Sequence, residues 1–184
     1  MASAISHAVA AAGIGAAFYL PGMAKRVWLL GVACSVFPDV DVVGFHFGVR
    51  YGDFWGHRGF THSLLFAVVL ASLALLASFR EQKLQISPTA LWAYFFLAGA
   101  SHGALDAMTD GGLGVAFFSP FDTTRYFLPW RPIVVSPIGI GRFFSTRGVA
   151  VLRSEAIWIW VPAALFAAFI VLMRRVMQRA EPSG

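Results

Sequence analysis

The sequence predicts an all-α fold, a polytopic membrane bundle of about five apolar helices with a long interfacial loop. Of the 184 residues, 58% are hydrophobic and 12% are charged, and the mean hydropathy is +0.71. Soluble domains carry roughly 25% charged residues, so this composition favours a membrane protein. Apolar segments alternate with polar connections along the chain. Its length is that of a single domain, residues 1–184.

Cysteine content and charge exclude several classes of protein. The one cysteine, Cys34, lies in an apolar stretch, which excludes an intramolecular disulfide and a thiolate metal cluster. The net charge of +5 comes mostly from arginines in predicted loops and in the tail. That pattern suits anionic lipid headgroups or phosphate better than nucleic acid. The expected partners are the lipid bilayer and a lipid or phosphoester substrate.

The first apolar segment, residues 2–20, is just long enough to span a membrane. It lacks the basic start of a signal peptide, so we expect it to be retained. Gly13 and Gly15 give it a small-residue face for close helix packing.

The second segment, residues 27–37, is short for a span and ends in FPDVDVV. This places Asp39 and Asp41 two apart, just past the predicted helix end. Acidic groups there oppose the helix dipole, and a cation would offset that cost. Turn-forming aspartates in a solvated loop are the alternative.

A polar loop, residues 44–61, leads into the motif HRGFTHS at residues 57–63. Thr61 is a candidate cap for the helix that follows, which would place His62 in its first turn and His57 in the approaching loop. The two imidazoles could then converge on one point. A neutral imidazole nitrogen is a good ligand for zinc and similar ions. Histidines that cap the helix or lie at the membrane interface are the alternative.

The third segment, residues 63–79, is predicted to span, and Ser87-Pro88 begins the fourth, residues 89–108. Near its far end the fourth segment contains SHGALDAMTD. His102 and Asp106 are four residues apart and share one helical face, and Asp110 continues the row. Ionisable groups in a spanning helix are costly and usually mark a functional interior. A structural His–Asp hydrogen bond is the alternative.

Residues 111–153 form a connection too long for a plain linker and rich in aromatic residues and arginines. This mixture favours the headgroup layer of a membrane. We expect a lid or re-entrant segment on the membrane, with simple anchoring as the alternative. Glu155 then opens the last span, residues 156–173, because an acid in the first turn complements the helix dipole.

If all five segments cross, the polar residues gather near one membrane face. They are His7, Asp39, Asp41, His57, His62, His102, Asp106 and Glu155. The opposite face receives short basic connections with Lys25, Arg26, Arg80 and Lys83, and a basic tail. The positive-inside rule makes that face cytoplasmic. The prediction is a multi-pass protein of the inner (cytoplasmic) membrane with its site on the extracytoplasmic face.

Histidine and carboxylate ligands without cysteine suit Zn²⁺, Mn²⁺ or Fe. The eight candidates would serve one to three ions. Adjacent ions can activate water and steady a leaving group, the usual apparatus of phosphoester hydrolysis. Arg58, between the two histidines of the motif, is the candidate to hold a phosphate oxygen, and Asp41 is the second residue predicted to act in catalysis.

These motifs, together with an early His7 and PDVD at Asp39 and Asp41, resemble the YdjM family of membrane-bound metal-dependent hydrolases. The motif order is similar to that of zinc-dependent phospholipase C, a helical enzyme with a multi-zinc site. The resemblance implies ligand positions for seven residues: His7, Asp39, Asp41, His57, His62, His102 and Asp106. Glu155 has nothing distinctive beside it. The second helical HxxxE of the phospholipase is missing, since His102 is the last histidine.

The resulting hypothesis is a membrane-bound hydrolase of a lipid phosphoester that uses metal-activated water. One rival is a non-catalytic metalloprotein, in which the ion pins the helices together. A second is a transporter that uses the intramembrane histidines and aspartates as a relay. Catalysis needs an open metal position, a structural site is closed, and a transporter needs a path to both faces.

Overall fold

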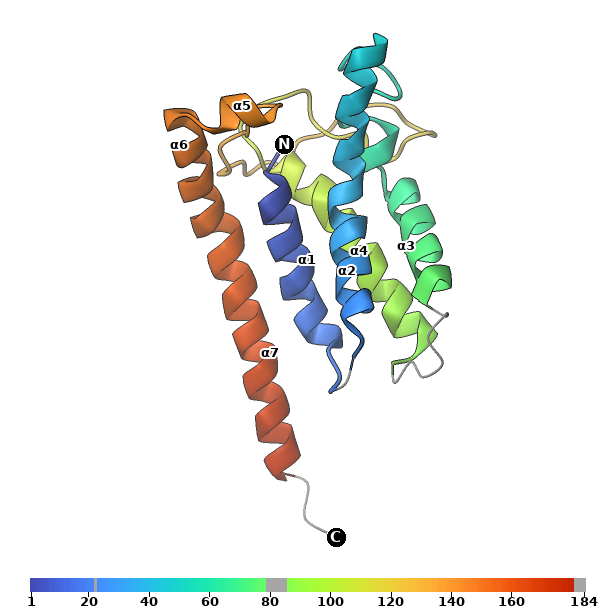
Figure 1. The fold of residues 1–184 in the computed structure, drawn as a ribbon, viewed down its shortest axis with the longest axis vertical. Coiled ribbons are helices and arrows are strands. Elements are labelled where there is room, and N and C mark those ends of the chain that lie inside the picture. The colour runs from blue at the N-terminus through green and yellow to red at the C-terminus, as the bar shows by residue number, and fades with distance from the viewer. Residues whose placement is uncertain (22, 79–85, 181–184) are drawn as a thin grey trace.

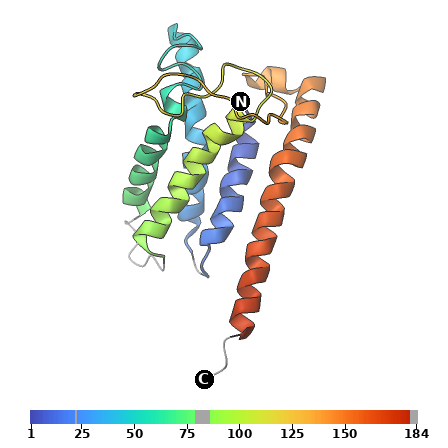
Figure 2. The same ribbon diagram turned by 180° about the vertical axis from the view of Figure 1, so that it is seen from behind.

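The computed structural model describes residues 1–21, 23–78 and 86–180. Within these ranges the chain is helical, without strands, and the predicted all-α bundle is confirmed. The bundle consists of α1 (Ala4–Phe18), α2 (Lys25–Val36), α3 (Leu64–Ser78), α4 (Pro88–Ala107) and α7 (Val161–Ala180). Helix α4 lies among α1, α2 and α3, and α7 runs along the outside of α1 (Figures 1 and 2). The predicted basic connection with Arg80 and Lys83 lies outside the described residues.

Helix α4 begins where the sequence predicts. The Ser87 hydroxyl accepts a hydrogen bond from the Ala90 N–H at 3.2 Å, and Pro88 occupies the first turn, where its missing N–H costs nothing. The apolar core then forms around α4, whose Leu91, Tyr94 and Phe95 are fully buried. In a membrane such a helix face is stabilised mainly by close packing against its neighbours, because lipid tails are as apolar as the side chains.

Small residues let the other helices approach, as predicted for α1. A Cβ added at Gly13 would lie 2.9 Å from the Ala163 side chain on α7, and one at Gly15 would lie 3.0 Å from the Tyr94 hydroxyl on α4. One at Gly31 of α2 would overlap the same hydroxyl. These contacts draw α1, α2 and α7 close to their neighbours.

The second helix is longer than predicted. It continues past Val36 as a 3-10 helix, η1 (Phe37–Phe47), and ends at Gly48, which has a left-handed φ of 80°. The expectation that Asp39 and Asp41 follow a helix end is therefore wrong. Pro38 is tolerated because it stands in the first turn of the tightened segment, and glycine adopts the positive φ without a Cβ clash. The polar loop starts at residue 48.

The last helix also starts earlier than predicted. After a short α5 (Ile140–Phe143), α6 (Thr146–Glu155), a π-helical turn η3 (Ala156–Trp160) and α7 form one continuous helix. Glu155 thus lies inside a helix, and the prediction that it opens a helix is wrong. The helix begins at Thr146, after the N-cap residue Ser145, and Glu155 is the last residue of α6.

Two helices are long and apolar enough to cross a membrane, Lys25–Phe47 and Thr146–Arg179. The apolar helices Ala4–Phe18 and Leu64–Ser78 are shorter. The number of crossings stays a prediction.

The connection after α4 folds across one end of the bundle, near the N-terminus (Figure 1). Isolated bridges pair Thr109 with Ile133 and Val115 with Tyr126. The Leu128 N–H also donates to the Ala107 carbonyl at 3.0 Å. This segment, residues 108–139, is therefore a folded cover over the bundle, which agrees with the prediction that it is more than a linker. Its contact with a membrane stays a prediction.

Candidate metal centre

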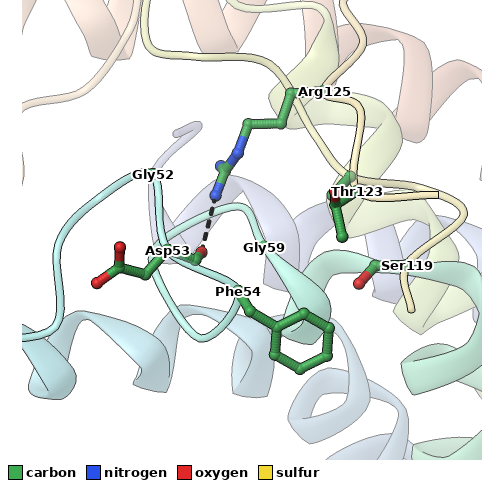
Figure 3. Close-up of a pocket in the computed structure, with 8 residues that line it drawn as sticks. Gly52, Asp53, Phe54, Gly59, Ser119, Thr123 and Arg125 are labelled. Atoms are coloured by element: carbon green, nitrogen blue, oxygen red, sulfur yellow. Dashed lines mark hydrogen bonds between the residues drawn. The ribbon is translucent and has the colours of Figure 1, made fainter. Parts of the chain in front are cut away.

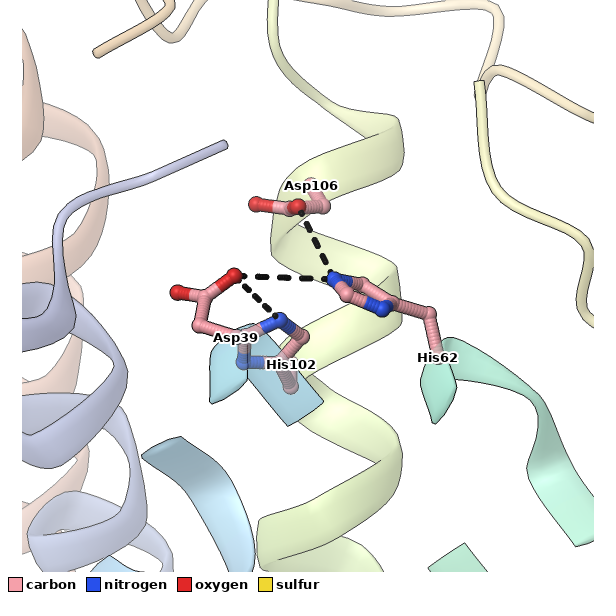
Figure 4. A group of neighbouring side chains, drawn as sticks. All are labelled: Asp39, His62, His102 and Asp106. Carbon is pink, nitrogen blue, oxygen red and sulfur yellow. Dashed lines mark ion pairs between the residues drawn. The ribbon is translucent and has the colours of Figure 1, made fainter. Parts of the chain in front are cut away.

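Histidine and aspartate side chains from distant parts of the chain meet beneath this cover. The largest group consists of Asp39 on η1, His62 on a 3-10 turn η2 (Phe60–His62), and His102 and Asp106 on α4. One ligand atom from each lies within 4.8 Å of the others. Figure 4 shows the four side chains pointing toward one another. Their spacing in the sequence, i and i+4 on α4, accounts for the pair that α4 presents.

Asp39 is at the centre of this group. Its Oδ1 lies 3.4 Å from His102 Nε2, 3.6 Å from His62 Nε2 and 3.9 Å from His57 Nδ1. His62 Nε2 also lies 3.7 Å from Asp106 Oδ2. These separations are longer than direct hydrogen bonds, and they leave the donor atoms aimed at common space.

Several of these atoms are buried without a hydrogen-bond partner among the described residues. They are both ring nitrogens of His7, both carboxylate oxygens of Asp39, and Nε2 of His57, His62 and His102. Buried polar atoms nearly always have a partner, because an unmade hydrogen bond costs roughly 1–3 kcal/mol. Such a concentration of unpartnered nitrogen and oxygen lone pairs fits a cation.

Contacts outside the group orient its members. His102 Nδ1 donates to the Ser35 carbonyl at 2.7 Å, which leaves Nε2 with the lone pair that faces Asp39. Asp106 Oδ1 accepts from the Ala2 N–H at 2.7 Å, and its Oδ2 accepts from Arg58 Nε at 3.0 Å. Partners of this kind fix the tautomer and the direction of metal ligands in known sites.

A second group contains Asp41, His57 and His62. Asp41 Oδ1 lies 2.8 Å from His57 Nδ1, and its Oδ2 lies 3.2 Å from His62 Nδ1. The Thr61 hydroxyl donates to the same Oδ2 at 2.7 Å. His62 thus belongs to both groups, through Nε2 in the first and Nδ1 in the second.

The predicted capping role of Thr61 is wrong. Ser63 accepts the hydrogen bond from the Phe66 N–H at 3.1 Å and caps α3, because η2 delays the start of that helix. His62 accordingly lies in η2, before the first turn of α3.

Electrostatics differ between the two histidines of the motif. Burial lowers the pKa of His57, although its hydrogen bond to Asp41 acts in the opposite direction, so its ring favours the neutral form. Burial would also lower the pKa of His62, but the neighbouring Asp39 and Asp41 carboxylates raise it to about 9. The carboxylates around His62 therefore favour positive charge at this point, and a divalent cation meets the same demand.

Arg58 does not face open space, contrary to the prediction that it holds a phosphate oxygen. It is fully buried, and besides Nε to Asp106 it donates from Nη1 to the Gly111 carbonyl and from Nη2 to the Thr109 hydroxyl, both at 2.8 Å. Its backbone φ of 64° is left-handed. Its guanidinium therefore positions Asp106.

Of the three remaining candidates, one lies beside the larger group and two lie outside both groups. His7 stacks on His102 with ring centroids 3.8 Å apart, and its Nε2 lies 3.5 Å from Asp106 Oδ1. Glu155 instead accepts from the Ser3 and Ser6 hydroxyls at 2.6 and 2.7 Å, and neither group found among the described residues includes it. Asp110 accepts a hydrogen bond from the Val135 N–H at 2.8 Å and is exposed. The prediction that it shares the helical face of His102 and Asp106 is wrong, because α4 ends at Ala107.

Sequence reasoning missed Ser35, Thr109 and Arg125 as supporting residues. Arg125 Nη1 donates to the His57 carbonyl at 2.7 Å. Hydroxyls and backbone carbonyls carry no distinctive pattern in a sequence, so nothing beside Ser35 or Thr109 points to these contacts. Arg125 lies in a segment rich in aromatic residues and arginines, but this pattern also fits a lipid surface and so does not identify its contact with His57.

An all-helical bundle with apolar spans and a buried His and Asp cluster defines a membrane protein with a candidate metal centre. Residues 1–179 match the family model described as YdjM inner membrane protein. The chain is also 35% identical over 175 residues to the inner membrane protein YbcI of Escherichia coli (strain K12), a match that covers 95% of this chain and 100% of that protein. No solved structure matches the chain. The chain belongs to the YdjM family of inner membrane proteins, which confirms the resemblance, while hydrolysis stays a prediction.

Proposed function

We propose that this inner membrane protein is a metal-dependent hydrolase that cleaves a phosphoester, of a lipid or its headgroup. The observation that carries the proposal is the group of Asp39, His62, His102 and Asp106, whose ligand atoms lie within 4.8 Å of one another. Nitrogen and oxygen donors without thiolate suit Zn²⁺, with Mn²⁺ and Fe as alternatives. A bound ion of this kind would supply a Lewis acid for a phosphoryl oxygen and a water of lowered pKa.

His62, which belongs to both groups of ligands, supports a single ion bound in the larger group. His62 would offer Nε2 to an ion in the larger group, and its Nδ1–H could then donate to Asp41 Oδ2, 3.2 Å away. Asp41 would also hold His57 through the 2.8 Å contact to Nδ1. This is the carboxylate–histidine arrangement that supports many zinc sites. In the proposal Asp41 therefore orients two imidazoles, and His7, stacked on His102, borders the ion.

A structural metal is the second candidate function, and the closure of the site favours it. His7, His57, His102 and Asp106 are fully buried, and Asp39, the most exposed of the larger group, is 9% exposed. Hydrolysis requires that water and substrate reach the ion, so the cover formed by residues 108–139 would have to move. An ion that only pins α4 to η1 and η2 requires no such motion.

Metal content and hydrolysis, measured on the same purified protein, test the proposal. His62→Ala and His102→Ala should each reduce bound Zn²⁺ sharply, because each removes a donor from the larger group. His46→Ala, at an exposed histidine of η1, is the matched control and should bind as the parent does. Unchanged zinc stoichiometry in both site variants would remove the metal site itself.

Hydrolysis of a panel of lipid and soluble phosphodiesters then separates the two functions. The hydrolase predicts turnover by the parent that depends on added Zn²⁺ or Mn²⁺ and is lost in His62→Ala. Metal binding without turnover of any panel member would favour the structural ion.

A further inference from the structure

A separate polar pocket of about 200 Å³ lies between the loop that carries the HRGFTHS motif and the cover (Figure 3). Phe54 and Gly59 line it from the loop, and Ser119, Thr123 and Arg125 line it from the cover. Pockets for drug-sized ligands measure roughly 300–1,000 Å³, so this one matches a smaller group.

The Ser119 hydroxyl is a buried hydrogen-bonding group at the pocket. Ser119 is 1% exposed, and its Oγ has no hydrogen-bond partner among the residues that the structure describes. Buried hydroxyls are rarely left in this state, since the lost hydrogen bond to water is not replaced. A ligand that accepts a hydrogen bond in the pocket would satisfy this hydroxyl.

Arg125 gives the pocket a positive charge. Its guanidinium donates to the carbonyls of His57, at 2.7 Å, and of Tyr51 and Asp53, at 3.1 and 3.2 Å. Carbonyl groups leave the formal charge in place, and within the described ranges no carboxylate lies at ion-pair distance from this guanidinium. The partly buried guanidinium thus has no direct ion-pair partner, and the Asp41 carboxylate acts on it only from a longer distance.

The one acidic side chain at the pocket points elsewhere. Asp53 Oδ2 accepts from the Arg50 N–H at 2.7 Å, and Figure 3 shows the carboxylate directed away from Arg125, Ser119 and Thr123. The hydrogen-bond donors among the side chains that line the pocket are thus a guanidinium and two hydroxyls, with Phe54 and Ala116 as apolar neighbours. Each of these groups donates hydrogen bonds, and an acceptor with negative charge gains most from a guanidinium.

We propose that this pocket binds a phosphate group, carried by a lipid headgroup or by a free solute. The binding of phosphate is independent of the metal centre. Its assignment as the subsite for the polar end of a phospholipid substrate rests on the proposed function. In that role Arg125 links the pocket to the candidate metal centre, because it donates a hydrogen bond to the backbone carbonyl of His57, a candidate ligand.

The test uses the full chain in phosphatidylcholine nanodiscs, titrated with inorganic phosphate by calorimetry. Ser119→Ala should weaken binding about tenfold or more, the usual effect of removing one hydrogen bond to a charged group. Arg125→Gln should weaken it further. Arg131→Gln is the matched control, since Arg131 belongs to the same segment but stacks over Phe127 outside the pocket, with 4.6 Å from its Cζ to the ring centroid. It should bind phosphate as the parent does.

A second arm replaces part of the phosphatidylcholine with phosphatidic acid, omits free phosphate, and counts the phosphatidic acid retained on the purified chain by mass spectrometry. If Ser119→Ala weakens the binding of inorganic phosphate, the ligand is a soluble phosphate. If it lowers the amount of retained phosphatidic acid, the ligand is a lipid headgroup. Either result supports the proposal. If Ser119→Ala and Arg125→Gln match Arg131→Gln in both arms, the proposal is overturned. Ser119→Ala decides alone if Arg125→Gln does not fold, because the Ser119 side chain supports no other described residue. Zinc content, measured on each sample, reports separately on the metal centre.

Discussion

Arg58 shows how a single backbone conformation serves the candidate metal centre. Non-glycine residues with a positive φ are uncommon and persist only where the surrounding contacts hold them. Arg58 is held by hydrogen bonds from Nε, Nη1 and Nη2 to Asp106, Gly111 and Thr109. The planar guanidinium can reach three acceptors at once, whereas the ammonium of a lysine is a point charge. The contact with Asp106 thus depends on the shape of the side chain as well as its charge.

Arg58→Lys should therefore weaken Zn²⁺ binding about 10- to 100-fold, the usual effect of losing an outer partner of a metal ligand. The measurement is a zinc titration against a competing chelator, with the unfolding temperature recorded on the same sample. Arg50→Lys, at an exposed position of the same loop, is the control. Parental zinc affinity in Arg58→Lys would show that Arg58 does not position Asp106.

The candidate ligands were predictable from the sequence where a short spacing determines their geometry. His102 and Asp106 share a face of α4 because they are four apart, and His62 belongs to a motif at a helix entrance. Arg58 and Glu155 were not predictable in the same way. Their partners, Asp106 and Ser3, lie 48 and 152 residues away, and only the packing of the helices decides whether such groups meet.

At the scale of elements, Glu155 joins the last helix to the first. It accepts hydrogen bonds from the Ser3 N–H and hydroxyl and from the Ser6 hydroxyl at the start of α1. Immediately after Glu155 the helix widens into the π-helical turn η3, and Trp160 at the end of that turn donates to Ser6 at 2.8 Å. The π-helical turn thus packs beside the start of α1.

Glu155→Ala should destabilise the protein by about 2–4 kcal/mol, because it leaves buried donors on Ser3 and Ser6 unpaired. Zinc affinity should stay at the parental value if Glu155 acts only in this junction. Thermal unfolding and zinc titration of one preparation check both parts, and Glu155→Gln, which keeps the shape and some acceptor capacity, should lose less stability. Loss of bound zinc with an unchanged unfolding temperature would instead restore Glu155 as a ligand.

The apolar helices themselves were predictable, since their hydrophobic runs are bounded by caps such as Ser87. The ends of two of them were not. Pro38 and two aspartates resemble a turn, yet the chain continues as η1 and places Asp39 beside His62 and His102, and Asp41 beside His57. Residues 146–155 have a polar composition that resembles a loop, yet they form α6, with Val151, Ser154 and Glu155 buried. Both continuations depend on tertiary contacts.

At the scale of the whole molecule, the candidate site and the basic end of α7 lie at opposite ends of the bundle. The N-terminus, the end of η1 and the cover gather at one end, and α7 runs to the other (Figure 1). If the bundle crosses the membrane as the sequence predicts, these ends face different compartments. The arginines near the end of α7 would then lie on the cytoplasmic side.

Cysteine labelling tests this orientation. In a Cys34→Ala background, Asp53→Cys should react with an impermeant reagent added outside, and Gln178→Cys only after the membrane is opened. Cys34→Ala alone should remain unlabelled. Labelling of both positions from the same side would contradict the arrangement, and an exchange of sides would keep the bundle but turn the site to the cytoplasm.

The close approach of Gly31 to Tyr94 determines how α2 lies against α4, below the candidate metal centre. Because α2 and η1 form one continuous helix, the position of α2 against α4 at Gly31 determines the position of Asp39, roughly 12 Å further along the helix. A methyl group at residue 31 would overlap the Tyr94 hydroxyl, and we expect the overlap to tilt α2 away from α4. Asp39 would then move away from His102, so a change that touches no candidate ligand would disturb the candidate metal centre.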